Sequence, residues 1–340
     1  MRFRTLISAL LLAFCGLAGR AWGQLAPSPD APPVSNAPAT DDDLDTAPTL
    51  KMNVNLVDVV FTVRSKNNEL LPHLTTADCK VLEDKVEQSL KSFTAEANLP
   101  LTMGILLDTS LSQERVLQLE QEAGSQFLNR VLRKKDQAFL LSFDMDVDLL
   151  QDLTNSPRLL TKALNSARIN ANYSIGSGPV PSSHPRGTVL YDAVYLASNE
   201  KMAPESGRKA LILLTDGDDE GSRVKINTAI EAANRSNTIV YVILLADVQS
   251  YLNQGLGYSG SSAMKKLSEE TGGRVINVGN NGKKLAAAFD AIEEELRTQY
   301  VATYKSSNTK QDGGFRKIQV ECKGDGLKVM TRKGYYAAKE

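Results

Sequence analysis

The chain has 340 residues, long enough for two ordinary domains, and its 42% hydrophobic and 23% charged residues are typical of a folded, soluble protein. Its 39 basic and 40 acidic residues leave a net charge of −1. Non-specific nucleic-acid binding requires a basic stripe, and the sequence has none, so we expect no nucleic-acid partner.

The first 23 residues have the layout of a secretory signal peptide. Two arginines precede an apolar run over residues 6–18, and Ala21-Trp22-Gly23 supplies a small-residue cleavage site. We therefore expect residues 1–23 to be removed and the chain to be exported to the periplasm, the cell surface or the extracellular space.

Two alternatives remain open for this segment. It could stay as a membrane anchor, although the apolar run is shorter than the roughly 20 residues that a bilayer span requires. Cys15 could carry a lipid, although Phe14 stands where lipoprotein processing needs a small residue. No later apolar stretch is long enough to cross a membrane, so we expect no span after cleavage.

Residues 24–49 predict a disordered linker, because they are rich in Pro, Ala, Ser and Asp and have almost no large apolar side chains. Residues 50–97 predict a β-rich flank, in which short β-branched and apolar runs are separated by turn residues. The expected strands cover residues 54–63, 80–84 and 89–93.

Residues 98–298 have a different pattern, in which apolar strands alternate with helical periodicity. The continuous apolar run over residues 101–107 indicates burial on both faces and hence a parallel sheet. Strands that alternate with helices predict a doubly wound α/β domain with a mostly parallel sheet. The expected strands cover residues 101–107, 138–143, 210–214, 238–244 and 274–278, and the expected helices cover residues 116–131, 157–167, 190–202, 225–235, 262–271 and 282–296.

Residues 299–340 return to β character, with expected strands at 300–304, 316–321 and 327–331. Neither this flank nor residues 50–97 has enough strands to bury a core alone. We therefore expect the two flanks to form one small β-sandwich, into which the α/β domain is inserted.

Cys79 and Cys322 remain after the expected cleavage, one in each flank. In an oxidising compartment two such thiols can form a disulfide, which would join the two ends of the folded chain. Two separate buried thiols are an open alternative, because buried free cysteines are common.

Three short segments carry hydroxyl and carboxylate groups where predicted strands end or predicted helices begin. Ligands of doubly wound sheets collect at the carboxyl ends of the strands, so the three segments can converge at one edge. They are Asp108-Thr109-Ser110-Leu111-Ser112, Gly187-Thr188 and Thr215-Asp216-Gly217.

Asp108, Ser110, Ser112, Thr188 and Asp216 together offer two carboxylates and three hydroxyls. Mg²⁺ is a small, hard cation that prefers oxygen ligands and keeps some water, and Mn²⁺ or Ca²⁺ accepts similar ligands. Hydroxyl ligands are neutral, so such a shell leaves the cation electropositive, with a position open for a carboxylate from outside. The set therefore predicts a metal site for recognition rather than for hydrolysis.

In this order and spacing, the three segments resemble the metal-ion-dependent adhesion site (MIDAS) of von Willebrand factor type A (vWA) domains. Other strings resemble the vWA-related proteins of acidobacteria, and the resemblance runs over about residues 53–337. These strings are Leu99-Pro100-Leu101, Gly207-Arg208-Lys209-Ala210, Leu267-Ser268-Glu269-Glu270-Thr271-Gly272-Gly273 and Arg332-Lys333-Gly334-Tyr335-Tyr336.

The resemblance implies that Ser110, Ser112 and Thr188 ligate the metal directly. It implies that Asp108 and Asp216 bind the metal directly or through water. It also implies a non-enzymatic module for protein interaction or cell adhesion, whose protein partner presents an Asp or Glu carboxylate to the metal.

Each segment is weak evidence alone. A Ser or Asp at a helix start is often only an N-cap, Thr188 could be a helix-entry hydroxyl, and Asp216 could belong to an ordinary turn. The order of the segments within a doubly wound pattern is what predicts the site. Leu111 departs from the family motif, in which glycine is frequent, and this bulkier residue can alter access for the partner.

Two further motifs have simpler interpretations. Residues 255–260 match G-x-G-x-x-G, but the strand–glycine–helix junction of a dinucleotide site is missing, so we expect a surface loop. Asp144, Asp146 and Asp148 begin like a Ca²⁺-binding EF-hand loop, yet Leu149 stands where that loop needs glycine. We expect these acids to form a solvated face.

We therefore expect an exported, Mg²⁺-dependent binding module, with residues 170–186 shaping the rim of the metal site. A structural envelope scaffold with a structural metal is one alternative. A metal-dependent hydrolase is another, although His73 and His184 are the only histidines and no G-x-S-x-G motif accompanies them.

Overall fold

The computed structural model describes residues 56–95, 99–169, 187–246 and 260–339. The predicted signal peptide and linker, the rim loop with His184, and the glycine-rich motif up to Ser259 lie outside these residues. Within the described residues, no helix is both long enough and apolar enough to cross a membrane.

A six-stranded sheet lies at the centre of the α/β region, with strand order β10-β9-β8-β5-β6-β7. Neighbouring strands are parallel except at one edge, where β7 runs antiparallel to β6. Every residue of β5, β8 and β9 is buried, so both faces of these strands are covered. The predicted doubly wound, mostly parallel α/β fold is confirmed. The strands are β5 (Leu101–Asp108), β6 (Gln137–Phe143), β7 (Val147–Thr154), β8 (Arg208–Thr215), β9 (Thr238–Leu244) and β10 (Val275–Asn277).

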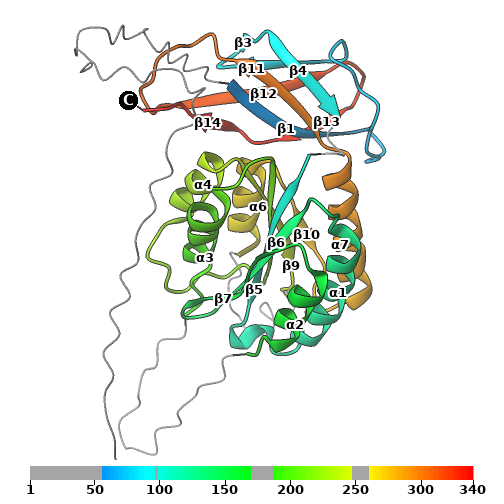
Figure 1. Cartoon of the computed structure of the whole chain (residues 1–340), viewed down its shortest axis with the longest axis vertical. Coiled ribbons are helices and arrows are strands. Elements are labelled where there is room, and N and C mark those ends of the chain that lie inside the picture. Colours follow the sequence, from blue (N-terminus) through cyan, green and yellow to red (C-terminus); the bar gives the residue numbers. More distant parts are fainter. Residues whose placement is uncertain (1–55, 96–98, 170–186, 247–259, 340) are drawn as a thin grey trace, which may run out of the picture. The chain divides into compact units, whose positions relative to one another are not determined.

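Helices cover both faces of this sheet, with α1, α2 and α7 on one face and α3, α4 and α6 on the other (Figure 1). Successive residues of β5 point to opposite faces. Ile105 belongs to the core that contains Phe127 of α1 and Phe289 of α7, whereas Leu106 belongs to the core that contains Met264 of α6. The helices are α1 (Leu117–Val131), α2 (Pro157–Ser166), α3 (Leu190–Leu196), α4 (Ile226–Arg235), α6 (Gly260–Thr271) and α7 (Gly282–Arg297).

Three local features differ from the sequence prediction. Strand β7 is not predicted by the pattern, because its residues are all partly or fully exposed and a strand at the sheet edge lacks a continuous apolar run. The helix expected over residues 190–202 is α-helical only to Leu196 and continues as a π-helical segment, Ala197–Met202. A separate 3₁₀ turn, Leu111–Gln113, precedes α1.

The two flanks form a pair of four-stranded antiparallel sheets, with strand orders β13-β1-β11-β4 and β14-β12-β2-β3. Each sheet contains strands from both flanks, as a shared sandwich requires. Phe61 and Tyr300 of one sheet share a buried core with Val81 and Ile318 of the other. The strands are β1 (Leu56–Arg64), β2 (Cys79–Glu83), β3 (Val86–Glu87), β4 (Leu90–Ala95), β11 (Tyr300–Lys305), β12 (Phe315–Cys322), β13 (Lys328–Thr331) and β14 (Gly334–Tyr336).

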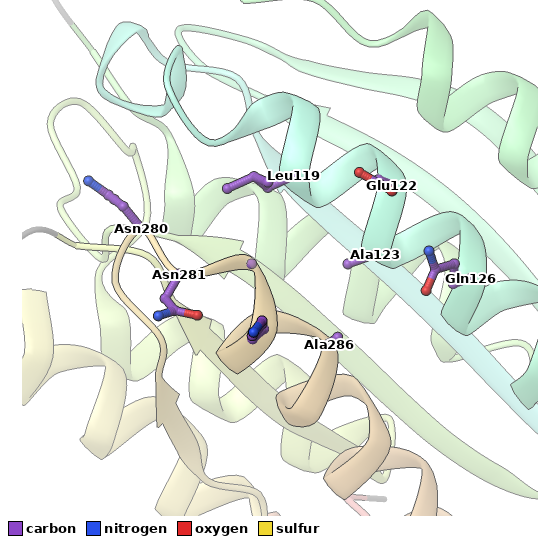
Figure 2. A pocket seen from close by; sticks show the side chains of 9 residues that line it. Leu119, Glu122, Ala123, Gln126, Asn280, Asn281 and Ala286 are labelled. Carbon is purple, nitrogen blue, oxygen red and sulfur yellow. The ribbon is translucent and has the colours of Figure 1, made fainter.

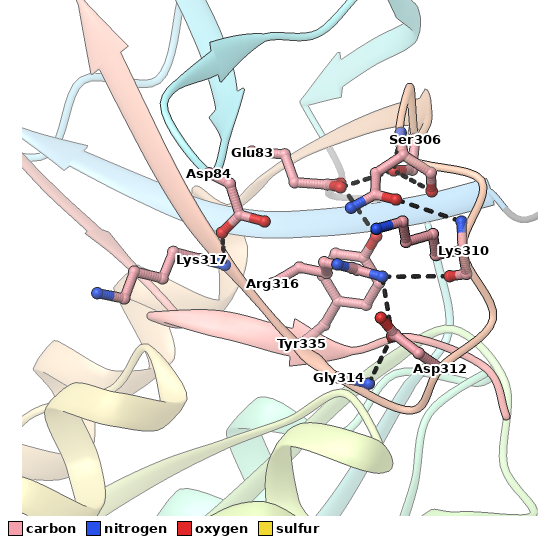
Figure 3. A network of polar contacts seen from close by, with 10 residues as sticks. Glu83, Asp84, Ser306, Lys310, Asp312, Gly314, Arg316, Lys317 and Tyr335 are labelled. Atoms are coloured by element: carbon pink, nitrogen blue, oxygen red, sulfur yellow. Dashed lines mark hydrogen bonds and ion pairs between the residues drawn. The ribbon is translucent and has the colours of Figure 1, made fainter.

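A buried carboxylate, Glu83, joins the two sheets through hydroxyl groups (Figure 3). The Tyr304 hydroxyl donates to Glu83 Oε2 over 2.8 Å, and the Ser306 hydroxyl donates to Oε1 over 2.6 Å. The Tyr335 hydroxyl also donates to Oε2, over 3.0 Å. Burial and hydrogen bonding to the carboxylate raise the pKa of Tyr304 above its usual value, so this phenol stays a donor.

Cys79 and Cys322 are joined by a disulfide with an S–S distance of 2.03 Å. They are directly opposed residues of the neighbouring strands β2 and β12, with a Cα–Cα distance of 4.0 Å. The bond links positions 243 residues apart, one in each flank. Of the two alternatives that the sequence leaves open, the structure therefore has the bridged one.

Charged groups connect the sandwich strands to the α/β region. Glu295 of α7 is fully buried, accepts a hydrogen bond from Arg64 of β1, and forms an ion pair with Arg274 over 2.5 Å. Arg332 donates to the Asp58 carbonyl of β1 over 2.8 Å and to the Asn234 carbonyl of α4 over 3.3 Å. These contacts anchor the inserted domain to the flanks.

Candidate metal site

The two predicted carboxylate ligands lie at the carboxyl ends of adjacent parallel strands. Asp108 is the last residue of β5, and Asp216 directly follows the last residue of β8. In the register of these strands Leu107 is paired with Leu214, so β5 and β8 end side by side at the same edge of the sheet. Both aspartates are buried, at 0% and 4% exposure.

Hydrogen bonds hold the Asp108 carboxylate at both oxygens. The Ser110 backbone N–H donates to Oδ1 over 3.0 Å, and the Thr215 hydroxyl donates to Oδ2 over 2.6 Å. The Thr215 hydroxyl in turn accepts from the Gly217 N–H over 3.0 Å. The turn after β8 is thus tied to the end of β5 through one buried hydroxyl.

The electrostatics of this pair favour a cation. Burial first and the Asp216 charge second raise the pKa of Asp108 from 3.8 to about 7, while the hydrogen bonds from Ser110 and Thr215 oppose the shift. Two carboxylates that meet out of water repel each other, and a divalent cation between them would offset that repulsion.

The Ser110 and Ser112 hydroxyls converge, with an Oγ–Oγ distance of 2.9 Å. Ser110 is the N-cap residue of the 3₁₀ turn, but its side chain makes no capping hydrogen bond, and the following helix begins later with Val116 as its cap. The simple N-cap interpretation of the D-x-S-x-S segment therefore does not account for these hydroxyls. Ser112 and Leu111 are exposed, so this side of the site opens to solvent.

Thr188 lies in a segment bound to the loops that follow β6 and β8. Its N–H donates to the Glu220 carbonyl over 3.1 Å and its carbonyl accepts from the Glu220 N–H over 3.0 Å, while the Val189 N–H donates to the Asp144 carbonyl over 2.7 Å. These backbone contacts place Thr188 at the same edge of the sheet as Asp108 and Asp216. Its side chain is partly exposed.

Acidic residues near the site stabilise its loops. Asp144 accepts from the Thr109 hydroxyl over 3.2 Å, which fixes the residue after Asp108. Asp219 accepts from the Tyr191 N–H over 3.2 Å and from the Ser222 hydroxyl over 2.5 Å, and burial raises its pKa. The alternating acids after β6 are thus not only a solvated face, because Asp144 is part of the loop structure.

The donor set fits a hard divalent cation. Among the described residues, no three His, Cys, Asp or Glu side chains gather in a group that could hold a metal ion. The site instead combines two carboxylates with hydroxyl groups, and all of these donors are oxygens, which Mg²⁺, Mn²⁺ and Ca²⁺ prefer.

A pocket of about 730 Å³ lies elsewhere, between α1 and the start of α7 (Figure 2). Leu119 and Ala123 line it from α1, and Asn281 and Ala286 line it from the α7 side. None of the five predicted ligands lines this pocket. The predicted metal ligands therefore lie away from this pocket.

The sequence reasoning missed Glu120, a carboxylate on α1 that is 0% exposed. The sequence feature that could have revealed Glu120 is its position on the buried face of α1, between Leu117 and Gly124, where an apolar residue is expected. Burial raises its pKa well above the usual value, and the charges of Asp108 and Asp216 raise it further. A third carboxylate therefore belongs to the electrostatic surroundings of the site.

No protein-family model and no curated protein matches the chain. Among solved structures, it is similar to proximal thread matrix protein 1 from the mussel byssus, with 14% identity, a TM-score of 0.48, and coverage of 63% of this chain and 51% of that chain. The chain thus spans about half the length of the mussel protein. Another structure of that protein is described as having a zinc-occupied MIDAS motif.

Two bacterial structures are also similar. A von Willebrand factor type A structure from Catenulispora acidiphila has 11% identity and a TM-score of 0.46, with 85% of this chain and 75% of that chain covered. The vWF domain of the type V pili tip protein Mfa5 from Porphyromonas gingivalis has 13% identity and a TM-score of 0.44, with 58% and 95% covered. These are likenesses of fold alone.

Proposed function

We propose that this vWA-like chain is an exported binding protein that presents Mg²⁺ to a carboxylate of a protein partner. In this proposal Asp108, Ser110, Ser112, Thr188 and Asp216 hold the metal, with Mn²⁺ and Ca²⁺ as alternative ions. The observation that carries the proposal is the meeting of two buried carboxylates, Asp108 and Asp216, beside a converging pair of hydroxyls.

The two sides of the site support recognition rather than burial of the metal. The carboxylates lie on the buried side, whereas Ser112 and Leu111 lie on the exposed side. Neutral hydroxyl ligands on the open side would leave the cation electropositive towards solvent, where an Asp or Glu of a partner could complete its coordination.

Export is supported by two independent features. The first residues have the pattern of a signal peptide, and Cys79 is joined to Cys322 in a disulfide, a bond typical of oxidising compartments. We propose a location in the periplasm, at the cell surface or outside the cell. The mass of the mature N-terminus after cell fractionation tests both the cleavage after Gly23 and the compartment.

Metal binding is tested by titrating Mg²⁺ into the unaltered protein and into the variants Asp108→Asn and Asp216→Asn by calorimetry. We expect binding in the unaltered protein and none in either variant. Asp148→Asn is the matched control, because Asp148 is an exposed aspartate on the edge strand β7 of the same sheet. Equal Mg²⁺ affinity in Asp108→Asn and in the control would contradict the proposed ligand set.

Partner recognition is tested with an immobilised peptide library in which every Asp- or Glu-containing peptide has an Asn or Gln counterpart. We expect Mg²⁺-dependent capture of some acidic peptides, loss of capture with chelator, and no capture of the amide counterparts. A large Mg²⁺-dependent rise in melting temperature without any carboxylate-dependent capture would instead favour the structural scaffold.

We propose a binding role rather than an enzymatic one, because the proposed ligand shell is mostly neutral and offers no placed base. A turnover screen with phosphate esters and Mg²⁺ tests this part of the proposal. Turnover that Asp108→Asn abolishes would overturn it.

A further inference from the structure

Glu120 is a buried acid whose place in α1 would suit an apolar side chain. It is 0% exposed and lies on the helix face that also buries Leu117 and Gly124. Among the residues that the structure describes, neither of its carboxylate oxygens has a hydrogen-bond partner. Burying a carboxylate without a partner is costly, so an acid at this position points to a partner that the chain itself does not supply.

The location of Glu120 identifies the region where that partner would lie. Asp108 and Asp216 act on Glu120 electrostatically, and both effects disfavour its charged form. Glu120 also lies in the first turn of α1, the helix that follows the segment from Asp108 to Ser112. A group that donates hydrogen bonds to Glu120 must also be stable beside the negative charges of the two predicted metal ligands. A hydrated cation meets both conditions.

Gln113 is a second unpartnered acceptor near the same ligands. It is 1% exposed, and its Nε2 donates to the Ser112 hydroxyl over 3.4 Å. Its Oε1 has no partner among the described residues. Once Glu120 is ionised, which a nearby cation would favour, the unsatisfied atoms of Gln113 and Glu120 are all acceptors, so the missing group is a hydrogen-bond donor. Water molecules on a cation are strong donors, because the metal polarises their O–H bonds.

We propose that Glu120 is a positioning residue of the metal centre, whose carboxylate accepts hydrogen bonds from water molecules carried by the cation. The inference rests on the proposed metal site and adds to it a group outside the five ligands. Mg²⁺ keeps several of its waters in protein sites. Groups that hold such waters typically change metal affinity by roughly 10- to 100-fold when they are replaced.

The test compares Glu120→Gln with Glu122→Gln in calorimetric Mg²⁺ titrations of the full chain. Glu122 is exposed on the same helix, so its replacement makes the same substitution without touching the buried site. We expect the Mg²⁺ affinity of Glu120→Gln to fall by roughly 10-fold or more. We expect Glu122→Gln to bind Mg²⁺ as the unaltered protein does.

A second measurement separates positioning from a purely structural role. With Mn²⁺ as a paramagnetic probe, hydrogen couplings of metal-bound water report how those waters are held. We expect Glu120→Gln to change these couplings and Glu122→Gln to leave them unchanged. Metal-free Glu120→Gln should melt no lower than the unaltered protein, because it replaces a buried acid, whose charged form is disfavoured, with a neutral amide of similar shape.

The outcomes distinguish this inference from the proposed function. If Asp108→Asn abolishes Mg²⁺ binding while Glu120→Gln leaves both the affinity and the water couplings unchanged, Glu120 is not part of the centre. If the unaltered protein binds no Mg²⁺, the proposed function fails and this inference fails with it. Glu120→Asp, which keeps the charge but shortens the side chain, should bind Mg²⁺ with intermediate affinity and serves if Glu120→Gln does not fold.

Discussion

The Thr215 hydroxyl donates to Asp108 Oδ2 over 2.6 Å, joining the last residues of the neighbouring strands β8 and β5. Thr215 is 0% exposed, and its hydroxyl also accepts from the Gly217 N–H. One buried hydroxyl therefore orients a predicted metal ligand and shapes the turn that carries the other ligand.

Replacing Thr215 with Val keeps the side-chain shape and removes both hydrogen bonds. We expect the free energy of unfolding to fall by about 1–3 kcal/mol, because buried partners lose a hydrogen bond. We also expect weaker Mg²⁺ binding, because Asp108 loses its orientation. Thr238→Val is the matched control: Thr238 is a buried threonine at the opposite end of the adjacent strand β9, so its replacement should cost stability and leave Mg²⁺ affinity unchanged.

The stability of the metal-free protein should fall as pH rises from 3.8 to about 7, the unfolded and folded pKa values of Asp108. Between these values the folded chain binds a proton more tightly than the unfolded chain. The stabilisation is therefore fully present below 3.8 and lost as pH passes about 7. Saturating Mg²⁺ should reduce this decline in stability, because the cation offsets the repulsion between the two ionised carboxylates.

Thermal denaturation over this pH range, with chelator and with Mg²⁺, measures the effect. Asp108→Asn should show a smaller decline than the unaltered protein, since an amide does not titrate. An equal decline in Asp108→Asn would mean that other groups cause it.

Removing the bond between Cys79 and Cys322 should destabilise the protein. The bond closes a long loop, and we expect its loss in Cys79→Ala/Cys322→Ala to cost about 2–5 kcal/mol of unfolding free energy. Denaturant unfolding of the variant and of the unaltered protein measures the difference. Alkylation followed by mass measurement, with and without reductant, is the direct check; a count that reductant does not change would show that the bridge is absent in solution.

Tyr304→Phe should weaken the sandwich by removing one donor to the buried Glu83 carboxylate. Hydrogen bonds to charged groups contribute about 1.5–3 kcal/mol, and we expect a loss of that order. Tyr195→Phe is the control, because Tyr195 is only partly buried on α3 and should change stability by less than about 0.5 kcal/mol. Equal melting temperatures for the two variants would contradict a stabilising role for the Glu83 network.

The central sheet could be predicted because β5, β8 and β9 are buried on both faces and read as continuous apolar runs. Strand β7 could not, because it lies at the edge and its sequence, VDLLQDLT, forms neither a continuous apolar run nor a strict polar–apolar alternation. The shared sandwich followed from counting strands in each flank. Its pairing, such as β1 with β11, depends on contacts between residues far apart in the sequence, which periodicity does not encode.

The candidate site, like the fold, could be predicted only in part. The order of its three segments placed Asp108 and Asp216 at one edge because parallel strands end together. The bond from Thr215 to Asp108 was not predictable, because it depends on side-chain directions at the ends of two strands. Glu120 was missed because an acid within a helical stripe is normally assigned to the solvent side.

The disulfide between Cys79 and Cys322 also determines how the protein bears mechanical load. The α/β region, from β5 to α7, lies entirely within the loop that this bond closes. Tension applied to the chain outside Cys79 and Cys322 therefore passes from β2 to β12 through the covalent bridge and bypasses the inserted domain. When the chain is pulled from both sides of this bridge, the inserted domain therefore carries no load along its backbone, and reducing conditions would remove that protection.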